Sequence, residues 1–314
     1  MRNEFADELT RLADTDPRLV MLSGDIGNRL FDTFRARHPS RFFNCGVAEQ
    51  NMMGVAAGMA LSGLRPVAYT ITPFVTTRCL EQIRVDVCYH EAPVIIVAVG
   101  AGLAYAGLGP THHACEDIAF LRSLPGMVVC CPGDAWEVRA ALRAALQQDR
   151  PVYIRMGKKG EPIIHPGIPA AFAFGRAITM REGDEVCLIS TGNILPEVLH
   201  AADELARHGH SVRVLSMHTV KPLDTLALAD AFRTCRVVAT AEEHSPIGGM
   251  GAAVAEWMAD SGTPVPRGGF LRFHTGDAFF RQSGEQDFAR EQLGLAGHQI
   301  AERVEVVLHG KAAG

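Results

Sequence analysis

The chain has 314 residues, of which 47% are hydrophobic and 21% are charged, which is enough apolar material for two ordinary domains. Its 35 acidic and 30 basic residues give a net charge of −5 and form no block of like charge. We therefore expect neither nucleic acid nor a membrane as a partner. The first 13 residues follow an amphipathic pattern unlike that of a signal peptide, which predicts a cytoplasmic protein.

The eight cysteines form no C-x-x-C pair, and most of them lie within apolar stretches. A disulfide framework or a zinc site would require closer or more regular spacing. We expect these cysteines to be free, buried thiols in a reducing compartment.

In the first half of the chain, short apolar runs alternate with segments of helical character. Runs of four to six apolar residues separated by helices indicate strands buried on both faces of a parallel sheet, and therefore the α/β class. The expected strands are Leu19–Leu22, Phe42–Cys45, Val67–Thr70, Val94–Val99, Val128–Cys131 and Val152–Arg155. The expected helices are about Ala48–Leu61, Thr76–Tyr89 and Ala135–Gln147.

Glycine and proline accumulate between residues 157 and 172, a pattern typical of a linker. The alternation then resumes, with strands expected at Val186–Ser190, Val212–Ser216 and Val237–Ala241 and helices at Pro196–His208, Leu223–Phe232 and Gly249–Ala259. We predict two α/β domains, residues 1–160 and 173–314, joined by a linker at 161–172.

The first candidate for chemistry is Glu49, in the segment Gly46-Val47-Ala48-Glu49-Gln50-Asn51. Gly46 allows a tight turn after the strand, and Glu49 enters the first turn of the next helix. A carboxylate is favoured there by the helix dipole, and it faces the carboxyl edge of the sheet, where α/β proteins bind ligands. A solvated first-turn glutamate is the alternative interpretation of this position.

The second candidate is the glycine-rich loop that ends in His112 and His113. Adjacent histidines diverge in a regular element, so a shared metal ion is not the default expectation. The loop alone leaves a catalytic or ligand-binding histidine and a packing role both open.

The third candidate is a group of cations, Arg155, Lys158 and Lys159, at the carboxyl end of a predicted buried strand. Arginine and lysine in this position suit an anionic ligand, although a solvated linker fits the composition equally well. The segment Gly24-Asp25-Ile26-Gly27-Asn28 lacks the spacing of the motif that binds magnesium diphosphate, and we expect no metal site in this chain.

Taken together, these segments resemble the C-terminal half of transketolases and of the related deoxyxylulose-phosphate synthases. The resemblance covers nearly the whole chain, and it rests on five motifs in the family order: Gly24-Asp25, Gly46–Asn51, Gly107–His112, Pro151–Arg155 and Glu242-Glu243-His244. It implies a parallel-sheet pyrimidine-binding domain of the thiamine diphosphate-binding fold, followed by a smaller transketolase C-terminal α/β domain.

The resemblance also implies roles for single residues. Glu49 matches the glutamate that hydrogen-bonds N1′ of the cofactor's aminopyrimidine and so activates thiamine diphosphate. Phe74 matches the phenylalanine that stacks on this ring, and Asp25 matches an aspartate near the cofactor. His112 matches a histidine that handles protons or substrate oxygens, and Arg155 matches a substrate-binding arginine. We expect His113 and Lys158 beside them on the substrate.

In the family, a domain N-terminal to these two holds the diphosphate and Mg²⁺, and this sequence starts too late to include it. The resemblance therefore implies that thiamine diphosphate is shared with a partner, an N-terminal subunit that holds most of the Mg²⁺ ligands. An α2β2 heterotetramer is the expected assembly, and the expected activity is that of a transferase moving a two-carbon ketol unit from a ketose to an aldehyde or other acceptor.

Several positions depart from the family pattern: His113 stands where glutamine is common, and Ile71 and Thr77 stand where other members carry aromatic residues of the cofactor pocket. Gly100 stands in the place of a histidine that grips the substrate phosphate, and Leu108 in the place of an aspartate that reads a hydroxyl group. Without these two polar side chains, the phosphate and the hydroxyl group of the usual sugar phosphates lose their binding partners, so the site should bind such substrates less well. We expect a non-standard substrate, such as an unusual or sulfonated sugar. The β subunit of a 2-oxoacid dehydrogenase and a non-catalytic docking subunit are the alternatives.

Overall fold

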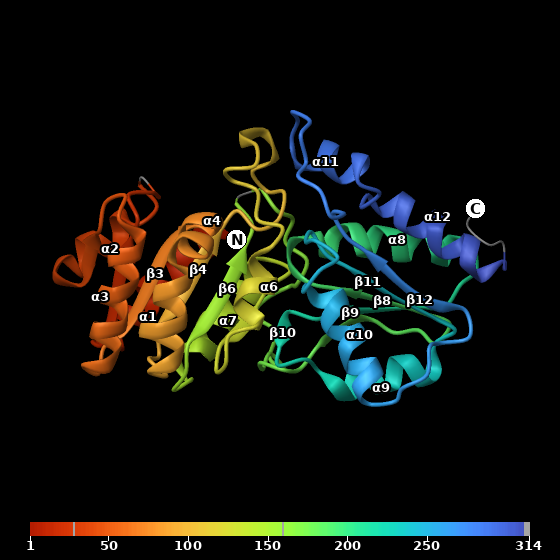
Figure 1. Cartoon of the computed structure of the whole chain (residues 1–314), viewed down its shortest axis with the longest axis horizontal. Helices are drawn as coiled ribbons and strands as arrows, with labels where there is room; N and C mark the ends of the chain where they lie inside the picture. Colours follow the sequence, from red (N-terminus) through yellow and green to blue (C-terminus); the bar gives the residue numbers. More distant parts are fainter. Residues whose placement is uncertain (28, 159, 311–314) are drawn as a thin grey trace.

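The computed structural model describes residues 1–27, 29–158 and 160–310. Asn28 and Lys159, the latter one of the three cations expected to bind an anion, lie outside the described residues. Figure 1 shows two α/β halves side by side, with the N-terminal half in red to yellow-green and the C-terminal half in green to blue. Each half is built on its own sheet of mainly parallel strands, so the predicted fold class is confirmed.

The first sheet has seven strands in the order β10-β5-β6-β4-β3-β1-β2. Six of them pair in parallel and correspond to the six apolar runs of the sequence: β1 (Leu19–Ser23), β2 (Phe42–Asn44), β3 (Arg65–Ile71), β4 (Ile95–Val99), β5 (Val128–Cys130) and β6 (Val152–Met156). Their carboxyl ends therefore meet at one edge of the sheet, where ligands bind in this class of fold.

Helices cover both faces of this sheet, and its central strands are buried along their whole length. The helices α1 (Arg2–Ala13) and α7 (Ala135–Leu146) pack against each other and on one face. The helix α3 (Glu49–Leu61) lies on the other face, where its buried alanines allow a close approach to β3. The remaining helices of this half are α2 (Asp32–Arg37), α4 (Thr72–Val75), α5 (Leu80–Gln82) and α6 (Asp117–Arg122).

The segment after β3 differs from the single helix expected at Thr76–Tyr89. It consists of the short helix α4, a turn of 3₁₀ helix, the short helix α5 and a π-helical stretch at Ile83–Tyr89. The chain bends at Thr76, whose φ and ψ of −107° and −81° are not helical. This irregular path leaves Phe74 and Arg78 at the carboxyl edge of the sheet, next to the start of α3.

The second sheet has five strands in the order β12-β11-β8-β9-β7. The expected strands are present as β8 (Val186–Ser190), β9 (Val212–Ser216) and β11 (Val237–Ala241), and they are joined by β12 (Gly269–Phe273) and the antiparallel edge strand β7 (Ile178–Arg181). The helices of this half are α8 (Leu195–Arg207), α9 (Thr225–Thr234), α10 (Met250–Asp260), α11 (Gln286–Gln292) and α12 (Gly297–Leu308). Among the described residues, none of the helices has both the length and the apolar character needed to cross a membrane.

One strand connects the two halves. The short strand β10 (Thr219–Lys221) comes from the C-terminal half of the sequence but pairs antiparallel with β5, at the edge of the first sheet. A single apolar core contains residues from both sheets, among them Leu22 and Val238. The two halves are therefore packed together, and the division at residues 161–172 stays a prediction.

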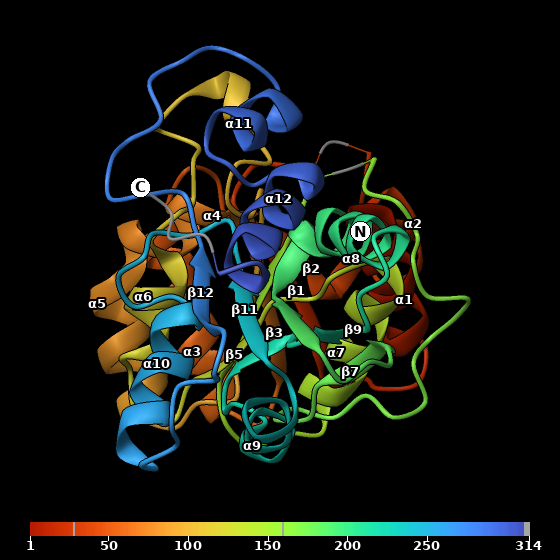
Figure 2. The same cartoon turned by 90° about the vertical axis from the view of Figure 1, so that its right-hand side faces the viewer.

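A second connection lies above the carboxyl edge of the first sheet. Figures 1 and 2 both show α11 and the loop before it next to the loop that follows β4. Leu103 and Ala106 of the β4 loop form a small apolar cluster with Phe280 and Ala289 of the C-terminal half. The glycine-rich loop that carries the two histidines therefore packs against the second domain.

Candidate active site

Most of the predicted site residues lie along the carboxyl edge of the first sheet. Glu49 begins the helix after β2, Phe74 belongs to α4 after β3, His112 lies in the loop after β4, and Lys158 follows β6. The parallel pairing of β1, β3, β4 and β6 brings these segments together from positions far apart in the sequence.

Glu49 is a buried carboxylate at a helix start, only 2% exposed. Gly46, with a φ of +69°, makes the turn that precedes α3, a conformation that favours glycine. A Cβ on Gly24 would lie 3.0 Å from Thr70 and 3.5 Å from Cγ of Glu49, so the glutamate stem packs in a space that Gly24 leaves open. One oxygen, Oε2, accepts a hydrogen bond of 2.7 Å from Nη1 of Arg78.

Phe74 lies between a cation and a histidine. The guanidinium carbon of Arg78 is 4.3 Å from the centre of the Phe74 ring, and the His112 ring meets Phe74 edge-on at 5.4 Å between centroids. The same guanidinium therefore covers the Phe74 ring and hydrogen-bonds Glu49. The structure thus brings together Glu49, Phe74 and His112, and it adds Arg78.

The two histidines of the loop have different environments. His112 is half-buried, its Nδ1 lies 2.9 Å from Oγ1 of Thr111, and its ring lies between the edges of Phe74 and Tyr105. Burial, with a smaller contribution from the charge of His113, lowers the pKa of His112 below its usual value. His113 is 7% exposed, and its Nε2 lies 3.1 Å from the carbonyl oxygen of Ala106. The side chain of His113 therefore braces its own loop.

Lys158 lies near the same edge with its side chain 26% exposed. Its ammonium group is 3.3 Å from Oε2 of Glu285 and 5.7 Å from the centre of the Tyr105 ring. Tyr105 in turn fills the space beside Gly100, since a Cβ on that glycine would lie 2.3 Å from the tyrosine ring. The space beside Gly100 is therefore occupied by an aromatic ring.

Asp25 lies apart from this group. It is exposed, has a φ of 57°, and accepts a hydrogen bond of 2.9 Å from the amide of Asn44. It lines a hollow of about 430 Å³ together with residues of the β1 loop, α2 and β2. Glu49, Phe74 and His112 do not line this hollow.

Arg155 lies deeper in the protein than the other predicted site residues. It is 1% exposed, its Nε donates to Asp117 at 2.8 Å, and its Nη2 donates to the carbonyl oxygens of Ala114 and Glu243. The carboxylate of Asp117 raises the pKa of Arg155 above its usual range, against the effect of burial. As a residue of a central strand, Arg155 points into the contact between the two domains, away from solvent. It ties the histidine loop to the C-terminal half.

Sequence reasoning missed two residues of this region, Arg78 and Tyr105. An arginine four residues after a phenylalanine is common on a helix and gave no signal by itself. Glu243 belongs to one of the motifs that carry the resemblance, and its carboxylate accepts hydrogen bonds from the backbone of the histidine loop and from α11. Only the tertiary contacts distinguish these side chains from solvated ones.

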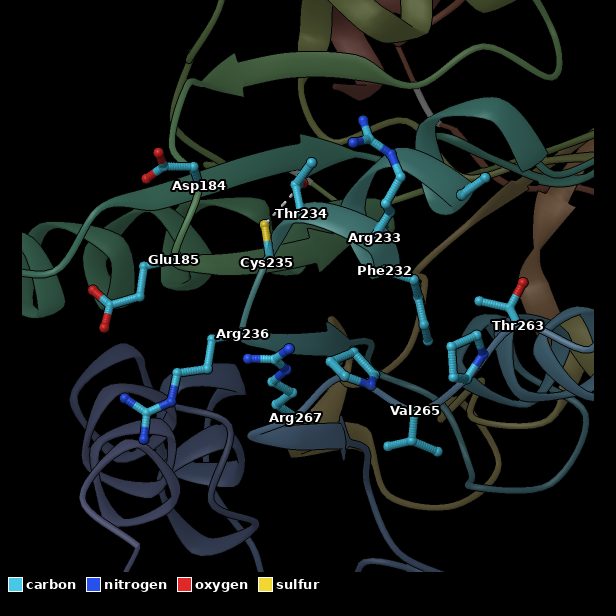
Figure 3. A pocket seen from close by; sticks show the side chains of 13 residues that line it. Asp184, Glu185, Phe232, Arg233, Thr234, Cys235, Arg236, Thr263, Val265 and Arg267 are labelled. Carbon is cyan, nitrogen blue, oxygen red and sulfur yellow. Dashed lines mark hydrogen bonds between the residues drawn. The ribbon is translucent and has the colours of Figure 1, made fainter.

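A hollow of about 1020 Å³ lies elsewhere, in the C-terminal domain (Figure 3). It is lined by Asp184 and Glu185, by the segment 232–236 and by residues 263–267. No predicted site residue is among them, so the volume of a hollow does not identify the candidate site in this chain.

The residues present fit the aminopyrimidine of thiamine diphosphate. The guanidinium of Arg78 is a flat, nitrogen-bearing group that already stacks on Phe74 and donates to Glu49. The guanidinium thus makes the two contacts that the aminopyrimidine would make, a stacking contact with Phe74 and a hydrogen bond to Glu49. Next to them, Oγ1 of Thr70 is buried without a hydrogen-bond partner among the described residues.

Comparisons with known proteins place the whole chain in one family. The family described as "Transketolase, pyrimidine binding domain" matches residues 1–161, and "Transketolase, C-terminal domain" matches residues 175–289. A "Putative transketolase C-terminal section" of Methanocaldococcus jannaschii is 37% identical over 97% of this chain and 95% of its own length. The "6-deoxy-6-sulfo-D-fructose transketolase subunit SqwH" of Clostridium sp. strain MSTE9 is 36% identical over 96% and 95%. A solved structure titled "Split gene transketolase, inactive beta4 tetramer" superposes with a TM-score of 0.87 at 35% identity, covering 99% of this chain and 98% of that one.

Proposed function

Because this chain belongs to the transketolase family and carries its pyrimidine-binding and C-terminal domains, we propose that it is the C-terminal subunit of a split, thiamine diphosphate-dependent transketolase. The reaction is the transfer of a two-carbon ketol unit from a ketose-type donor to an aldehyde or other acceptor. The observation that carries the proposal is the buried Glu49 carboxylate, which faces the same planar space as the Phe74 ring.

When bound, thiamine diphosphate supplies the nucleophilic carbon that carries the two-carbon unit. Glu49 would hold N1′ of its aminopyrimidine, and the low exposure of Glu49 would keep water from competing for this hydrogen bond. Phe74 would stack on the ring. Asp25, in the loop that follows β1, is assigned only to the neighbourhood of the cofactor.

His112 is placed to exchange a proton with a substrate oxygen. Its Nδ1 is engaged with Thr111, which leaves Nε2 for the substrate. The lowered pKa keeps the ring neutral near pH 7, and a neutral imidazole both accepts and donates a proton. His113, which braces the loop, acts on the substrate only through the position of His112.

We propose that the substrate carries an anionic group, phosphate or sulfonate, and that Lys158 binds it. The Tyr105 ring beside Gly100 and the exposed Leu108 replace polar groups that read ordinary sugar phosphates in the family. The relative from Clostridium is named for a sulfonated fructose, which supports including sulfonated sugars among the candidates. Buried Arg155 is not needed for this contact.

A partner subunit completes the site in this proposal. The exposed apolar side chains of Phe43 and Val47, 44% and 76% exposed, lie in β2 and in the turn before Glu49. Apolar exposure beside a site is typical of a surface that another protein covers. The partner is the diphosphate-binding chain, which would hold the diphosphate and most Mg²⁺ ligands in an α2β2 assembly.

A ketol-transfer assay tests the proposal. This chain is combined with its diphosphate-domain partner, thiamine diphosphate and Mg²⁺, and incubated with phosphorylated, sulfonated and neutral ketoses plus an aldehyde acceptor. We expect transfer from at least one anionic ketose, and loss of transfer when either chain is left out. In a parallel assay with a 2-oxoacid and an artificial electron acceptor as oxidant, oxidative decarboxylation of the 2-oxoacid without ketol transfer in the first assay would favour the dehydrogenase alternative.

A further inference from the structure

The side chain of Arg78 makes two contacts at once at the candidate active site. Its Nη1 donates to Oε2 of Glu49 at 2.7 Å, and its guanidinium carbon lies 4.3 Å from the centre of the Phe74 ring. Planar stacking on an aromatic ring and a hydrogen bond to a buried carboxylate are both favourable interactions for arginine. Under the proposed function, they are also the two interactions that the cofactor's aminopyrimidine needs.

We propose that Arg78 holds the aminopyrimidine position in the cofactor-free chain and is displaced when thiamine diphosphate binds. This inference rests on the proposed function and concerns what happens at its site before the cofactor arrives. Arg78 is thus a resident competitor of the cofactor.

The two occupants cannot share the site. Oε2 of Glu49 is engaged by Arg78, and the carboxylate as a whole is only 2% exposed, so a second planar donor cannot reach it from solvent while the guanidinium stays. One face of the Phe74 ring is covered by the same guanidinium, whose carbon lies 4.3 Å from the ring centre. Because heavy atoms in stacked groups lie about 3.5–4 Å apart, no second planar group fits between the guanidinium and the ring.

The displacement needs only a side-chain rotation. The backbone carbonyl oxygen of Arg78 accepts a hydrogen bond of 3.0 Å from the amide of Gln50 in α3, so the backbone is anchored to the helix that carries Glu49. The Arg78 side chain is 41% exposed and has a solvent side into which it can turn. Exposed side chains change rotamer on the picosecond-to-nanosecond timescale, so the switch does not limit catalysis.

Arg78 closes the site in part of the chains, and only the remaining fraction can bind the cofactor. The apparent dissociation constant is therefore the intrinsic dissociation constant divided by that open fraction. Removing Arg78 should therefore tighten cofactor binding, whereas removing a genuine cofactor ligand would weaken binding. The direction of the change in cofactor affinity therefore distinguishes a competing arginine from a cofactor-binding arginine at this position.

The test is calorimetric titration of thiamine diphosphate, with Mg²⁺ present, into the complex of this chain with its diphosphate-domain partner. Arg78→Ala should lower the dissociation constant about two- to fivefold, the factor expected for a partly exposed ion pair. Arg78→Lys, which keeps the charge but not the flat group, should fall between Arg78→Ala and the unmodified chain. Arg84→Ala is the matched control, since Arg84 is an exposed arginine on the same segment, and it should leave the affinity unchanged.

An unchanged or weaker affinity of the Arg78→Ala complex overturns the inference while leaving the proposed function standing. If the unmodified complex binds no cofactor at all, the proposed function fails and the inference fails with it. A double-mutant cycle on the free chain gives a second check that needs no partner. Arg78→Ala, Glu49→Ala and the double variant should show a favourable coupling in the free energy of unfolding, and strict additivity would mean that the two side chains do not pair.

Discussion

The carboxylate of Glu243, which follows β11 in the C-terminal domain, accepts a hydrogen bond of 2.9 Å from the backbone amide of Leu103 in the histidine loop. The same carboxylate is paired with Nε of Arg290 at 2.6 Å and with the amide of Gln286. Gly102 leaves room for it, since a Cβ there would lie 2.4 Å from Cβ of Glu243. The C-terminal domain therefore helps to position the loop that carries His112.

The pair of Glu243 and Arg290 should matter for stability. Both side chains are buried, at 1% and 7% exposure, and Glu243→Ala would leave a buried guanidinium without its main partner. We expect the free energy of unfolding, measured in urea, to fall by about 3 kcal/mol. Glu256→Ala is the control, because the carboxylate of Glu256 is 59% exposed where it pairs with Arg122, and its loss should cost less than about 1 kcal/mol. Equal losses in the two variants would show that Glu243 contributes no more than a surface pair.

Replacing Glu49 should abolish turnover without dissociating the complex. Glu49→Gln keeps the shape of the side chain but removes the carboxylate, and the expected loss in kcat is about 10²- to 10⁴-fold. Analytical ultracentrifugation with the partner chain should show unchanged assembly. Glu81→Gln, an exposed change on the neighbouring segment, serves as the control and should keep full activity. Full turnover by Glu49→Gln would remove Glu49 from the mechanism and favour the docking-subunit alternative.

The two histidines should respond differently to replacement by alanine. His112→Ala should lower kcat with little change in the melting temperature, because His112 is half-buried and faces the site. His113→Ala should lower the melting temperature, because its buried ring contacts the Ala106 carbonyl and Phe280. Since burial lowers the pKa of His112, the neutral form persists as the pH falls through 6.5, and kcat should decline only at lower pH. A decline that begins above pH 6.5 would contradict this assignment.

Glu137 should give the chain a pH-dependent stability. Burial raises the pKa of Glu137 to about 7, from an ordinary value of 4.5, even though Gly133 and Ser216 donate hydrogen bonds to it. Between these two values only the folded state holds the proton, so the contribution of Glu137 to the free energy of unfolding is largest below pH 4.5 and falls as the pH rises toward 7. The slope for this one group is at most about 1.4 kcal/mol per pH unit. Comparing urea unfolding of the unmodified chain with Glu137→Gln isolates this effect, and a constant difference across the range would contradict it.

The sequence was sufficient to predict the six parallel strands of the first sheet, the three central strands of the second, and the edge at which the site lies. The buried strands could be recognised as runs of apolar residues, because a parallel strand that is covered on both faces is apolar along most of its length. The short strand β10 was not predicted, since three residues carry no period, and its pairing with β5 depends on the packing of the two domains. The break in the helix after β3 was missed because the bend at Thr76 has no glycine to mark it.

The candidate site was predictable in part for the same reason. Glu49 and His112 follow predicted strands, so their position at one edge could be inferred from order alone. The burial of Arg155 could not, because a strand in the sequence does not reveal whether its polar side chain meets a ligand or a second domain. Here Asp117 and the Glu243 carbonyl surround it. The part played by Arg78 could be recognised only from its distances to Glu49 and Phe74 in the structure.

The most direct test of the central claim is to measure where the cofactor binds. Thiamine diphosphate with Mg²⁺ is titrated by calorimetry into this chain alone, into the diphosphate-domain partner alone, and into the mixture of both. A site shared between the two chains predicts saturable binding by the mixture, with one cofactor per pair of chains, and much weaker or no binding by either chain alone. Equally tight binding by this chain alone, or no binding by the mixture, would contradict the shared site.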